Sequence, residues 1–385
     1  MTAPLATLPR SVSTYEDARA EVIRDLLVYL SSIWPPGQPM DPREWFEKYA
    51  EGYTDAVILA QMEAALLAAW SVGEALAAQG STKNSEYPLD ILAFTSTDGQ
   101  GRPVMGQAYA SAGMVGAAGA GAAAAGASGS AAIAEAWPIV AMSLARATQT
   151  IISDTSRSVK SAEMVSRNVG WIRTLTPPSC PRCAILAGKF HRNPTAGFNR
   201  HPGCDCTQVP YDEDRKHPDF QGLFVEPKDY FDTMNQTEQD KWLGKANAQA
   251  VRDGADFNQV INARRGMSTV TDKFGQRTVV TTEGTSKKGW AAQYLRKQYG
   301  AKLEKQPGSR YRQMNRPRLM PEEIYKIADG DRDIAMNLLH KNGFYLDASP
   351  TLTSKMSFYP RERELAEAAK RARQKLQARG LKLNS

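Results

Sequence analysis

The sequence predicts an α+β protein that is mostly α-helical, and three observations lead to this prediction. Apolar side chains recur at helical spacing over most of the first 165 residues. All four cysteines fall in one short stretch that also has the clearest β-strand pattern of the chain. The part after residue 220 alternates short helical and turn-rich segments and is rich in Lys and Arg. We therefore expect a helical N-terminal domain, a small cysteine-stapled β region and a basic helical C-terminal segment.

Length and composition are consistent with more than one folded domain. A chain of 385 residues with 42% hydrophobic residues can build two or three cores of a soluble protein. The N-terminus has no apolar stretch of signal-peptide length behind a basic start, so we expect synthesis in a reducing cytoplasm. The regions we expect are a helical domain at 1–165 with an Ala/Gly-rich run at 109–134, a Cys/His core at 166–220, a basic mixed α/β segment at 221–354 and a basic helical tail at 355–385.

Caps and periodicity predict the first two helices. Ser13-Thr14 precedes two acidic residues, and apolar residues then repeat every three or four positions up to Trp34-Pro35. Asp41-Pro42 begins a longer helix that runs toward Gln79. Its expected inner side carries Trp45, Tyr49, Tyr53, Val57, Met62, Leu66 and Trp70. Core packing explains these aromatic residues better than a binding stripe does.

An uncharged run follows the second helix. Residues 103–134 carry no charge, and 116–132 consist only of Ala, Gly and Ser. Length alone permits a membrane span, but Ala and Gly are weakly hydrophobic and no aromatic belt or basic flank frames the run, so we expect no membrane partner. A flexible linker and a close-packing helix are the remaining alternatives; in the second, the small face would be Gly113, Gly116, Gly119 and Gly126. We expect Pro138 in the first turn of the next helix, which continues toward Arg167.

The stretch from Trp171 to Pro210 holds the cysteines as two close pairs. Cys180-x2-Cys183 and Cys204-x-Cys206 are separated by 20 residues, and His201 is the only nearby substitute ligand of suitable type. Two close pairs of thiolates can converge on one tetrahedral centre, and a reducing compartment favours a metal over disulfides. Zinc is therefore the expected cofactor, with disulfide-paired or free thiols as the alternatives. We expect a strand at 171–176 to deliver the first pair, and a return strand at 198–205 and 209–211.

The same stretch resembles a known protein family. Cys180, Cys183, Leu186, Gly188-Lys189, His201-Pro202, Cys204, Cys206 and Pro210 look like the core motif of the MuF-like (phage head morphogenesis, VG15-type) minor capsid proteins. The motif fixes about ten positions across about thirty. A weaker likeness extends through the helical N-terminal half and through Arg318, Pro321, Glu322, Ile324, Tyr325 and Asn342-Gly343-Phe344.

The resemblance implies a structural virion component of a tailed bacteriophage. Such a protein lies inside the head near the portal vertex, and in the host cytoplasm before assembly. Its implied partners are the portal protein and capsid or scaffold proteins, and it assists assembly and genome packaging or ejection by binding. Some relatives carry an extra enzymatic domain, and no protease triad pattern follows Pro210 here.

We expect no enzyme. The H-E-x-x-H, G-x-x-x-x-G-K-[ST] and G-x-S-x-G motifs are missing, and every histidine follows the first cysteine, whereas a zinc deaminase needs H-x-E before its cysteine pair. The alternative is a zinc-knuckle nucleic-acid-binding protein or nuclease. Its water-activating candidates would be His191, His201 and His217 near Asp205 or Asp212.

Charge is distributed unevenly along the chain, whose formal net charge is +7. Residues 1–263 carry 22 Lys/Arg against 29 Asp/Glu, whereas 264–318 carry 14 against 3 and 355–385 carry 9 against 3. Such a basic back part predicts an anionic partner, either non-specific double-stranded DNA or an acidic protein. The expected contact residues are Arg264, Arg265, Lys287, Lys288, Arg296, Lys297, Arg310, Arg312, Lys370, Arg371 and Arg373. The interleaved Trp290, Tyr294, Tyr299 and Tyr311 either stack on bases or form an ordinary core.

Short elements are expected along the back part. A polar helix at 226–251 precedes turns and short strands at 267–285, where Gly275 and Gly284 act as breakers. Helices are predicted at 287–302, from Pro321, at 335–340 ending at Asn342-Gly343, and after Pro360.

Overall fold

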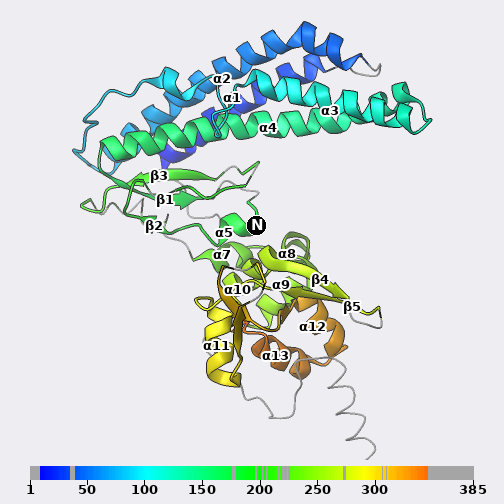
Figure 1. The fold of residues 1–385 in the computed structure, drawn as a ribbon. Coiled ribbons are helices and arrows are strands. Elements are labelled where there is room, and N and C mark those ends of the chain that lie inside the picture. Colours follow the sequence, from blue (N-terminus) through cyan, green and yellow to red (C-terminus); the bar gives the residue numbers. More distant parts are fainter. Residues whose placement is uncertain are drawn as a thin grey trace, which may run out of the picture. The chain divides into compact units, whose positions relative to one another are not determined.

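The fold is α+β and mostly α-helical, as predicted (Figure 1). The computed structural model describes residues 9–34, 40–175, 179–195, 197–201, 203–204, 206–215, 217, 220, 223, 226–271, 275–305, 307–308 and 310–345. The helix predicted after Pro360 lies outside these residues. The chain divides into two compact units, Met1–Tyr230 and Phe231–Ser385.

Four long helices build most of the first unit. They are α1 (Arg10–Ile33), α2 (Pro42–Ala78), α3 (Met105–Ala124) and α4 (Gly129–Ser166), and a short 3-10 helix, η1 (Ile91–Phe94), lies between α2 and α3. Asp41 begins α2 by accepting hydrogen bonds from the backbone N–H groups of Arg43 and Glu44, at 2.9 and 3.2 Å. Three tryptophans close the core at one end of the bundle. The Trp34 ring lies 4.9 Å from that of Trp45 and 5.0 Å from that of Trp137.

The prediction of which α2 residues face the core is partly wrong. Trp45, Tyr53 and Val57 are fully buried, but Leu66 and Trp70 are 60% and 45% exposed. Small residues face the core in that half of the helix: Ala60, Ala64, Ala65, Ala68 and Val72. Close packing of helices selects small side chains at the contact. The prediction instead assigned the largest apolar side chains in this half of the helix to the core. Among the described helices, α2 alone has the length and the apolar composition of a membrane span, and 44% of its apolar window is buried inside the protein. A core helix meets the same criteria.

The Ala/Gly run forms a helical hairpin rather than a linker. It supplies the second half of α3, a turn at Gly126 with a φ of 77°, and the start of α4, which Ser128 caps by accepting from the Ala131 N–H. At Gly119 a Cβ atom would lie 2.6 Å from Ile133, so α3 and α4 approach each other too closely there for a side chain. Pro138 lies inside α4 instead of in its first turn. The alanine-rich turns before it carry the helix through the proline at the cost of one backbone hydrogen bond.

A three-stranded antiparallel sheet follows α4. The strands are β1 (Gly170–Thr174), β2 (Phe190–His191) and β3 (Thr207–Tyr211), in the order β2-β1-β3, and α5 (Pro181–Ala184) is a single turn between β1 and β2. The strand at 171–176 is therefore confirmed up to Thr174. The return strand begins later than predicted, at Thr207, and no described residue of 198–205 is in a strand. Ile172, Val209 and Tyr211 pack against Val12 of α1 and Ala75 of α2.

The second unit consists of short elements around two small sheets. Its helices are α8 (Gln236–Leu243), α9 (Lys245–Arg252), α10 (Phe257–Ala263), η2 (Arg264–Gly266), α11 (Trp290–Tyr299), α12 (Pro321–Ala328) and α13 (Arg332–Lys341), and α7 (Pro227–Asp232) spans the division between the units. One sheet has the order β4-β5-β8, from β4 (Met267–Thr271), β5 (Arg277–Thr281) and β8 (Arg318–Leu319), and β6 (Leu303–Lys305) pairs with β7 (Arg312–Met314).

The predicted polar helix at 226–251 is three helices. Asn235 and Glu238 form a capping box that starts α8, and Gly244, with a φ of 89°, separates α8 from α9. Strands β4 and β5 lie within the predicted 267–285, and α12 begins at Pro321 as predicted. Helix α11 is shorter than the predicted 287–302, and α13 begins three residues before the predicted 335–340.

Candidate metal centre

The four cysteines and His201 come together in the first unit, and none of the cysteines is in a disulfide. Two groups of three have all their ligand atoms within 4.8 Å of one another: Cys180, Cys183 and His201, and Cys183, Cys204 and Cys206. The Cys183 Sγ atom lies 3.2 Å from that of Cys204, and His201 Nε2 lies 2.9 Å from the Cys180 Sγ. Cys183, Cys204 and Cys206 are buried. The cluster is compatible with a metal site.

The pairing of β1 with β3 explains why the two cysteine pairs meet. In this antiparallel pair Thr174, the last residue of β1, lies opposite Thr207, the first residue of β3. The chain therefore leaves β1 toward Cys180 at the same sheet end where it arrives from Cys206. Two loops that are distant in sequence thus face each other across one end of the sheet.

Local turns point the sulfurs into the cluster. Cys180 is the N-cap of α5, and its Sγ accepts from the Cys183 N–H at 3.4 Å. Gly203 has a φ of 72°, and the Cys204 N–H donates to the His201 carbonyl at 3.2 Å. This turn leads the chain from His201 into Cys204, whose Sγ lies in the cluster.

Thiolates are favoured at two of the cysteines. Hydrogen bonding by the Cys183 thiol, with smaller contributions from the Cys183 N–H and His201, lowers the pKa of Cys180 to about 5. The thiols of Cys183 and Cys206, followed by the Arg157 charge, lower the pKa of Cys204. Hydrogen bonds with Cys180 and Cys204 raise the pKa of Cys183. Hydrogen bonding by the Cys183 thiol alone would lower the pKa of Cys206, but the Cys204 thiolate and burial raise it. Metals bind the thiolate form of cysteine, so the directions at Cys180 and Cys204 suit ligation, whereas Cys183 and Cys206 would have to lose their protons on binding.

One polar face of α4 holds the second cysteine loop. Thr150, Asp154, Arg157 and Ser161 follow each other at helical spacing. The Arg157 guanidinium donates to the carbonyl of Cys204, and to that of Cys206 at 2.8 and 3.1 Å. The Thr150 hydroxyl accepts from the Gly203 N–H at 3.0 Å, and the Ser161 hydroxyl accepts from the Gln208 side chain at 3.1 Å.

Sequence reasoning missed this face. Its signal is a set of polar residues recurring every three or four positions between the apolar residues of a long helix, which indicates a buried polar contact.

A second arginine lies beside the cysteines. Arg173 of β1 is 2% exposed, and its guanidinium lies 3.7 Å from the centroid of the Phe198 ring. Burial lowers its pKa, and the charges of Cys206, Cys183 and Cys204 oppose this shift. Its Nε and Nη1 atoms are buried and have no hydrogen-bond partner among the described residues.

The other predicted histidine and carboxylate candidates have separate surroundings. His191 stacks on Trp171 with ring centroids 3.9 Å apart, and burial lowers its pKa. Asp212 accepts from Ser81 at 2.6 Å and pairs with Lys83 at 2.9 Å. Burial alone would raise the pKa of Asp212, but these contacts lower it. His217 lies 6.1 Å from Phe220 between ring centroids, and Asp205 is outside the described residues.

The predicted contact residues of the basic segment are exposed where the structure describes them. These are Arg264, Arg265, Lys287, Lys288, Arg296, Lys297, Arg310 and Arg312, whereas Lys370, Arg371 and Arg373 lie outside the described residues. The aromatic residues behave differently. Tyr294 is buried, with Trp290 and Tyr299 packed against the same core, and Tyr311 is 61% exposed. The core alternative therefore applies to three of the four.

No protein-family model, curated protein or solved structure matches this chain.

Proposed function

We propose that this chain is a structural minor capsid protein of a tailed bacteriophage, of the MuF-like class, and that it acts by binding. The observation that carries the proposal is the convergence of the motif on which the resemblance rests. Its cysteines and His201 meet in one cluster. Gly188, with a φ of 69°, turns the chain back toward β2 while its N–H donates to the Arg173 carbonyl at 3.1 Å. Pro210 lies in β3, and its carbonyl accepts from Gln79 of α2 at 3.0 Å.

The weaker part of the resemblance is also spatially coherent. Arg318 donates to the carbonyls of Asn342 and Gly343 at 2.6 and 3.2 Å and lies 4.4 Å from the Phe344 ring. Glu322 and Tyr325 bind other elements of the second unit, through Asn247 and Asp253 at 2.6 Å each. Residues quoted for the likeness thus hold the framework of each unit together.

We infer that zinc occupies the cluster, with Cys180, Cys183, Cys204 and Cys206 as its ligands. Sulfur and nitrogen donors in a tetrahedral set suit zinc. Four thiolates and one Zn²⁺ carry a net charge of −2, and buried charges need compensation. Arg157 and Arg173 are 5% and 2% exposed and supply two positive charges beside the ligands. In this assignment His201 is a hydrogen-bond donor to the Cys180 thiolate, which orients that ligand.

In this role the zinc stabilises the fold and does no chemistry. A structural site of this type contributes folding free energy directly, since a preformed site does not exist in the unfolded chain. It would fix the two loops at the end of the sheet and hold them against α4. The partners proposed for the protein are the portal protein and capsid or scaffold proteins.

Mass spectrometry of purified particles tests the proposal. Proheads and mature virions from a phage that encodes this chain are expected to contain it in a few copies relative to the major capsid protein. A matched phage with a stop codon early in the gene gives the background. Absence of the chain from both kinds of particle would overturn the structural role. Incubating the pure protein with plasmid DNA and Mg²⁺ tests the alternative function as a nuclease, because a nuclease would nick the plasmid and a structural protein would not.

A further inference from the structure

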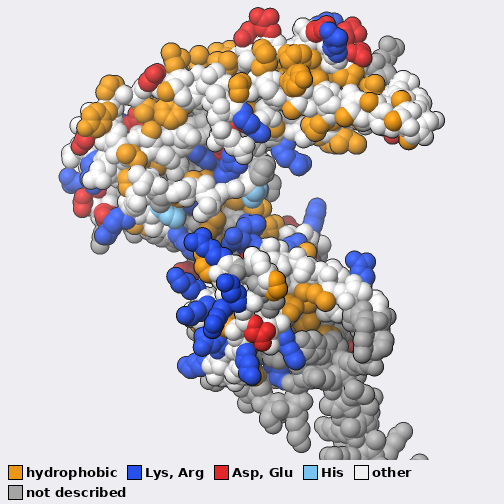
Figure 2. Space-filling model, viewed as in Figure 1, with side chains coloured by type: hydrophobic (Ala, Val, Ile, Leu, Met, Phe, Trp, Pro, Cys, Tyr) orange, Lys and Arg blue, Asp and Glu red, His pale blue; other side chains and the backbone are white. Residues whose placement is uncertain are grey.

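The surface around α11 concentrates positive charge in the second unit. Between residues 284 and 318 the sequence has ten Lys/Arg and a single acidic residue, Glu304. Figure 2 shows Lys and Arg side chains gathered on the side of the second unit that carries α11. Arg318 does not contribute, because it is fully buried and its donors are taken by main-chain carbonyls.

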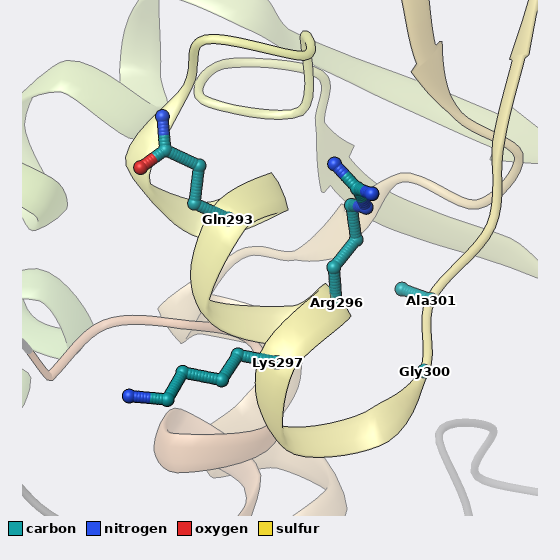
Figure 3. Close-up of a pocket in the computed structure, with 5 residues that line it drawn as sticks. All are labelled: Gln293, Arg296, Lys297, Gly300 and Ala301. Atoms are coloured by element: carbon teal, nitrogen blue, oxygen red, sulfur yellow. The ribbon is translucent and has the colours of Figure 1, made fainter.

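The exposed charges line a continuous hollow. One part, of about 510 Å³, is lined by Gln293, Arg296, Lys297, Gly300 and Ala301 (Figure 3). A neighbouring part, of about 620 Å³, shares Arg296 and Ala301 with it and adds Lys287, Lys302 and Arg312. We call the two parts together the α11 groove. Five cations therefore face one concave surface, and Glu304 is the one acidic residue among its described lining.

These cations have no acidic partners among the described residues. Lys287, Arg296, Lys297, Lys302 and Arg312 form no ion pair there, although other exposed cations do, such as Arg192 with Glu213. Uncompensated charge on a concave surface concentrates an anionic ligand. The groove is therefore suited to an anion that offers several charges in succession.

The placement of the aromatic side chains around α11 favours double-stranded over single-stranded nucleic acid. Surfaces that bind single strands present aromatic rings on which bases stack. Here Trp290, Tyr294 and Tyr299 pack into the core beneath α11. Tyr311, next to Arg312 in the sequence, is the exposed ring of the four. A surface that offers five cations and one exposed ring suits the phosphates on the outside of a duplex, whose bases are already stacked, better than a single strand.

We propose that the α11 groove binds the sugar-phosphate backbone of double-stranded DNA without reading its sequence. This inference rests on the proposed function for the source of the DNA, which would be the genome being packaged or ejected. An acidic protein surface is the competing partner. The proposal commits to DNA because the groove gathers five cations that have no acidic partners among the described residues, and a duplex presents phosphates in close, regular succession along both strands.

The test measures binding of the full-length protein to labelled 30-base-pair duplexes of two unrelated sequences by fluorescence anisotropy. Both duplexes should bind equally, and affinity should fall steeply between 50 and 200 mM salt. The double variant Arg296→Gln/Lys302→Gln should weaken binding and make the slope of log K against log[salt] less negative by about 1.8, since each lost phosphate contact removes about 0.9.

Two matched variants are the controls. Lys241→Gln/Lys245→Gln removes the same charge from exposed positions of the second unit outside the groove and should leave the slope unchanged. Arg296→Lys/Lys302→Arg keeps the charge and should retain most of the affinity. The unfolding temperature of each variant verifies folding.

Three outcomes would overturn the proposal. The first is that no duplex binds at 50 mM salt. The second is that Arg296→Gln/Lys302→Gln and Lys241→Gln/Lys245→Gln change the slope equally. The third is that poly-glutamate displaces the duplex at an equal concentration of charge, which would assign the groove to an acidic protein. Each is read on the pure protein and is independent of whether phage particles contain the chain.

Discussion

The Arg318 guanidinium donates through Nε to the main-chain carbonyl of Asn342 at 2.6 Å. Its two other nitrogens donate to the carbonyls of Glu283 and Gly343, at 2.9 and 3.2 Å. One side chain therefore ties three segments of the second unit together: the turn after β5, the strand β8 and the end of α13. Asn342 completes the joint, because its side-chain oxygen accepts from the Leu319 N–H at 2.7 Å.

Arg318→Lys should strongly destabilise the second unit. Lysine keeps the charge but lacks the planar guanidinium that donates to three carbonyls at once. Buried carbonyls therefore lose their donors, and the free energy of unfolding should fall by about 2–4 kcal/mol. Urea unfolding of the full chain checks the loss. Arg312→Lys, at an exposed position, is the control and should change the free energy of unfolding by less than about 0.5 kcal/mol. Equal stability of the two variants would contradict the role of Arg318.

Cys183→Ser should release the metal, because Cys183 belongs to both groups of ligand atoms. His201→Ala should retain it if the four cysteines are the ligands. Elemental analysis of protein purified under reducing conditions without chelator is expected to give one zinc per wild-type chain, and Cys183→Ser should melt at least about 10 °C lower. Loss of zinc in His201→Ala would move His201 into the ligand set. Less than about a tenth of an equivalent in the wild type would refute the zinc site.

Much of the candidate metal centre could be predicted because its signal is local. The two close cysteine pairs and the neighbouring histidine are visible in the sequence alone, and these five residues form the cluster. The sequence could not predict that α4 holds the second loop, since Arg157 and Cys206 are 49 residues apart and their contact depends on how the sheet packs on the helix. Nor could it separate core aromatic residues from binding ones around α11, where cations and rings alternate along one short helix.

Gly119→Ala should destabilise the helical hairpin, whereas Gly121→Ala should not. A Cβ at Gly119 would lie 2.6 Å from Ile133, but at Gly121 it would meet nothing within 4 Å. Alanine is the better helix former by about 1 kcal/mol, so Gly121→Ala should be neutral or stabilising, while overpacking at Gly119 should cost about 1–3 kcal/mol. Thermal unfolding of both variants measures the difference, and the same sign of change in both would contradict the close approach of α3 and α4.

Fold prediction failed elsewhere in the bundle for a related reason. The prediction places Leu66 and Trp70 in the core because they are large and apolar, whereas alanines form that contact in the structure. The sequence predicts Pro138 as a helix start, since a proline within a helix is recognised only once the turns before it are known to be helical. The Asp41 cap is a local signal, and the start of α2 is predicted from it, whereas the start of α4 at the Ser128 cap is not predicted.

Stability should rise with pH above neutrality because of Lys160. This lysine is 2% exposed, its Nζ lies 3.3 Å from the centroid of the Tyr15 ring, and it donates to Thr207 and to the Gln208 carbonyl at 3.1 and 3.2 Å. Burial lowers its pKa from 10.5 to about 7, against the Glu16 charge and together with the charges of Arg19 and Arg157. Between these two pKa values the unfolded chain binds more protons than the folded chain, so folding becomes more favourable as pH rises.

The measurement compares the wild type with Lys160→Met in urea at pH 7 and pH 9. The free energy of unfolding of the wild type should gain about 1–2 kcal/mol relative to the variant between these two values of pH. Lys326→Met, whose side chain is 66% exposed, should show no such difference from the wild type. If the free energy of unfolding changes equally with pH in the wild type and in Lys160→Met, Lys160 is not the cause of the pH dependence.

The order of the elements along the chain has a consequence for biosynthesis. The polypeptide completes α4 first, then the Cys180 pair, and then the Cys204 pair a few tens of residues later, so every residue of the cluster and both neighbouring arginines have been translated by Cys206. Closing a loop of this length costs little entropy. The proposed zinc could therefore be captured on the ribosome as soon as this region has emerged, while the residues from 231 onward are still being made.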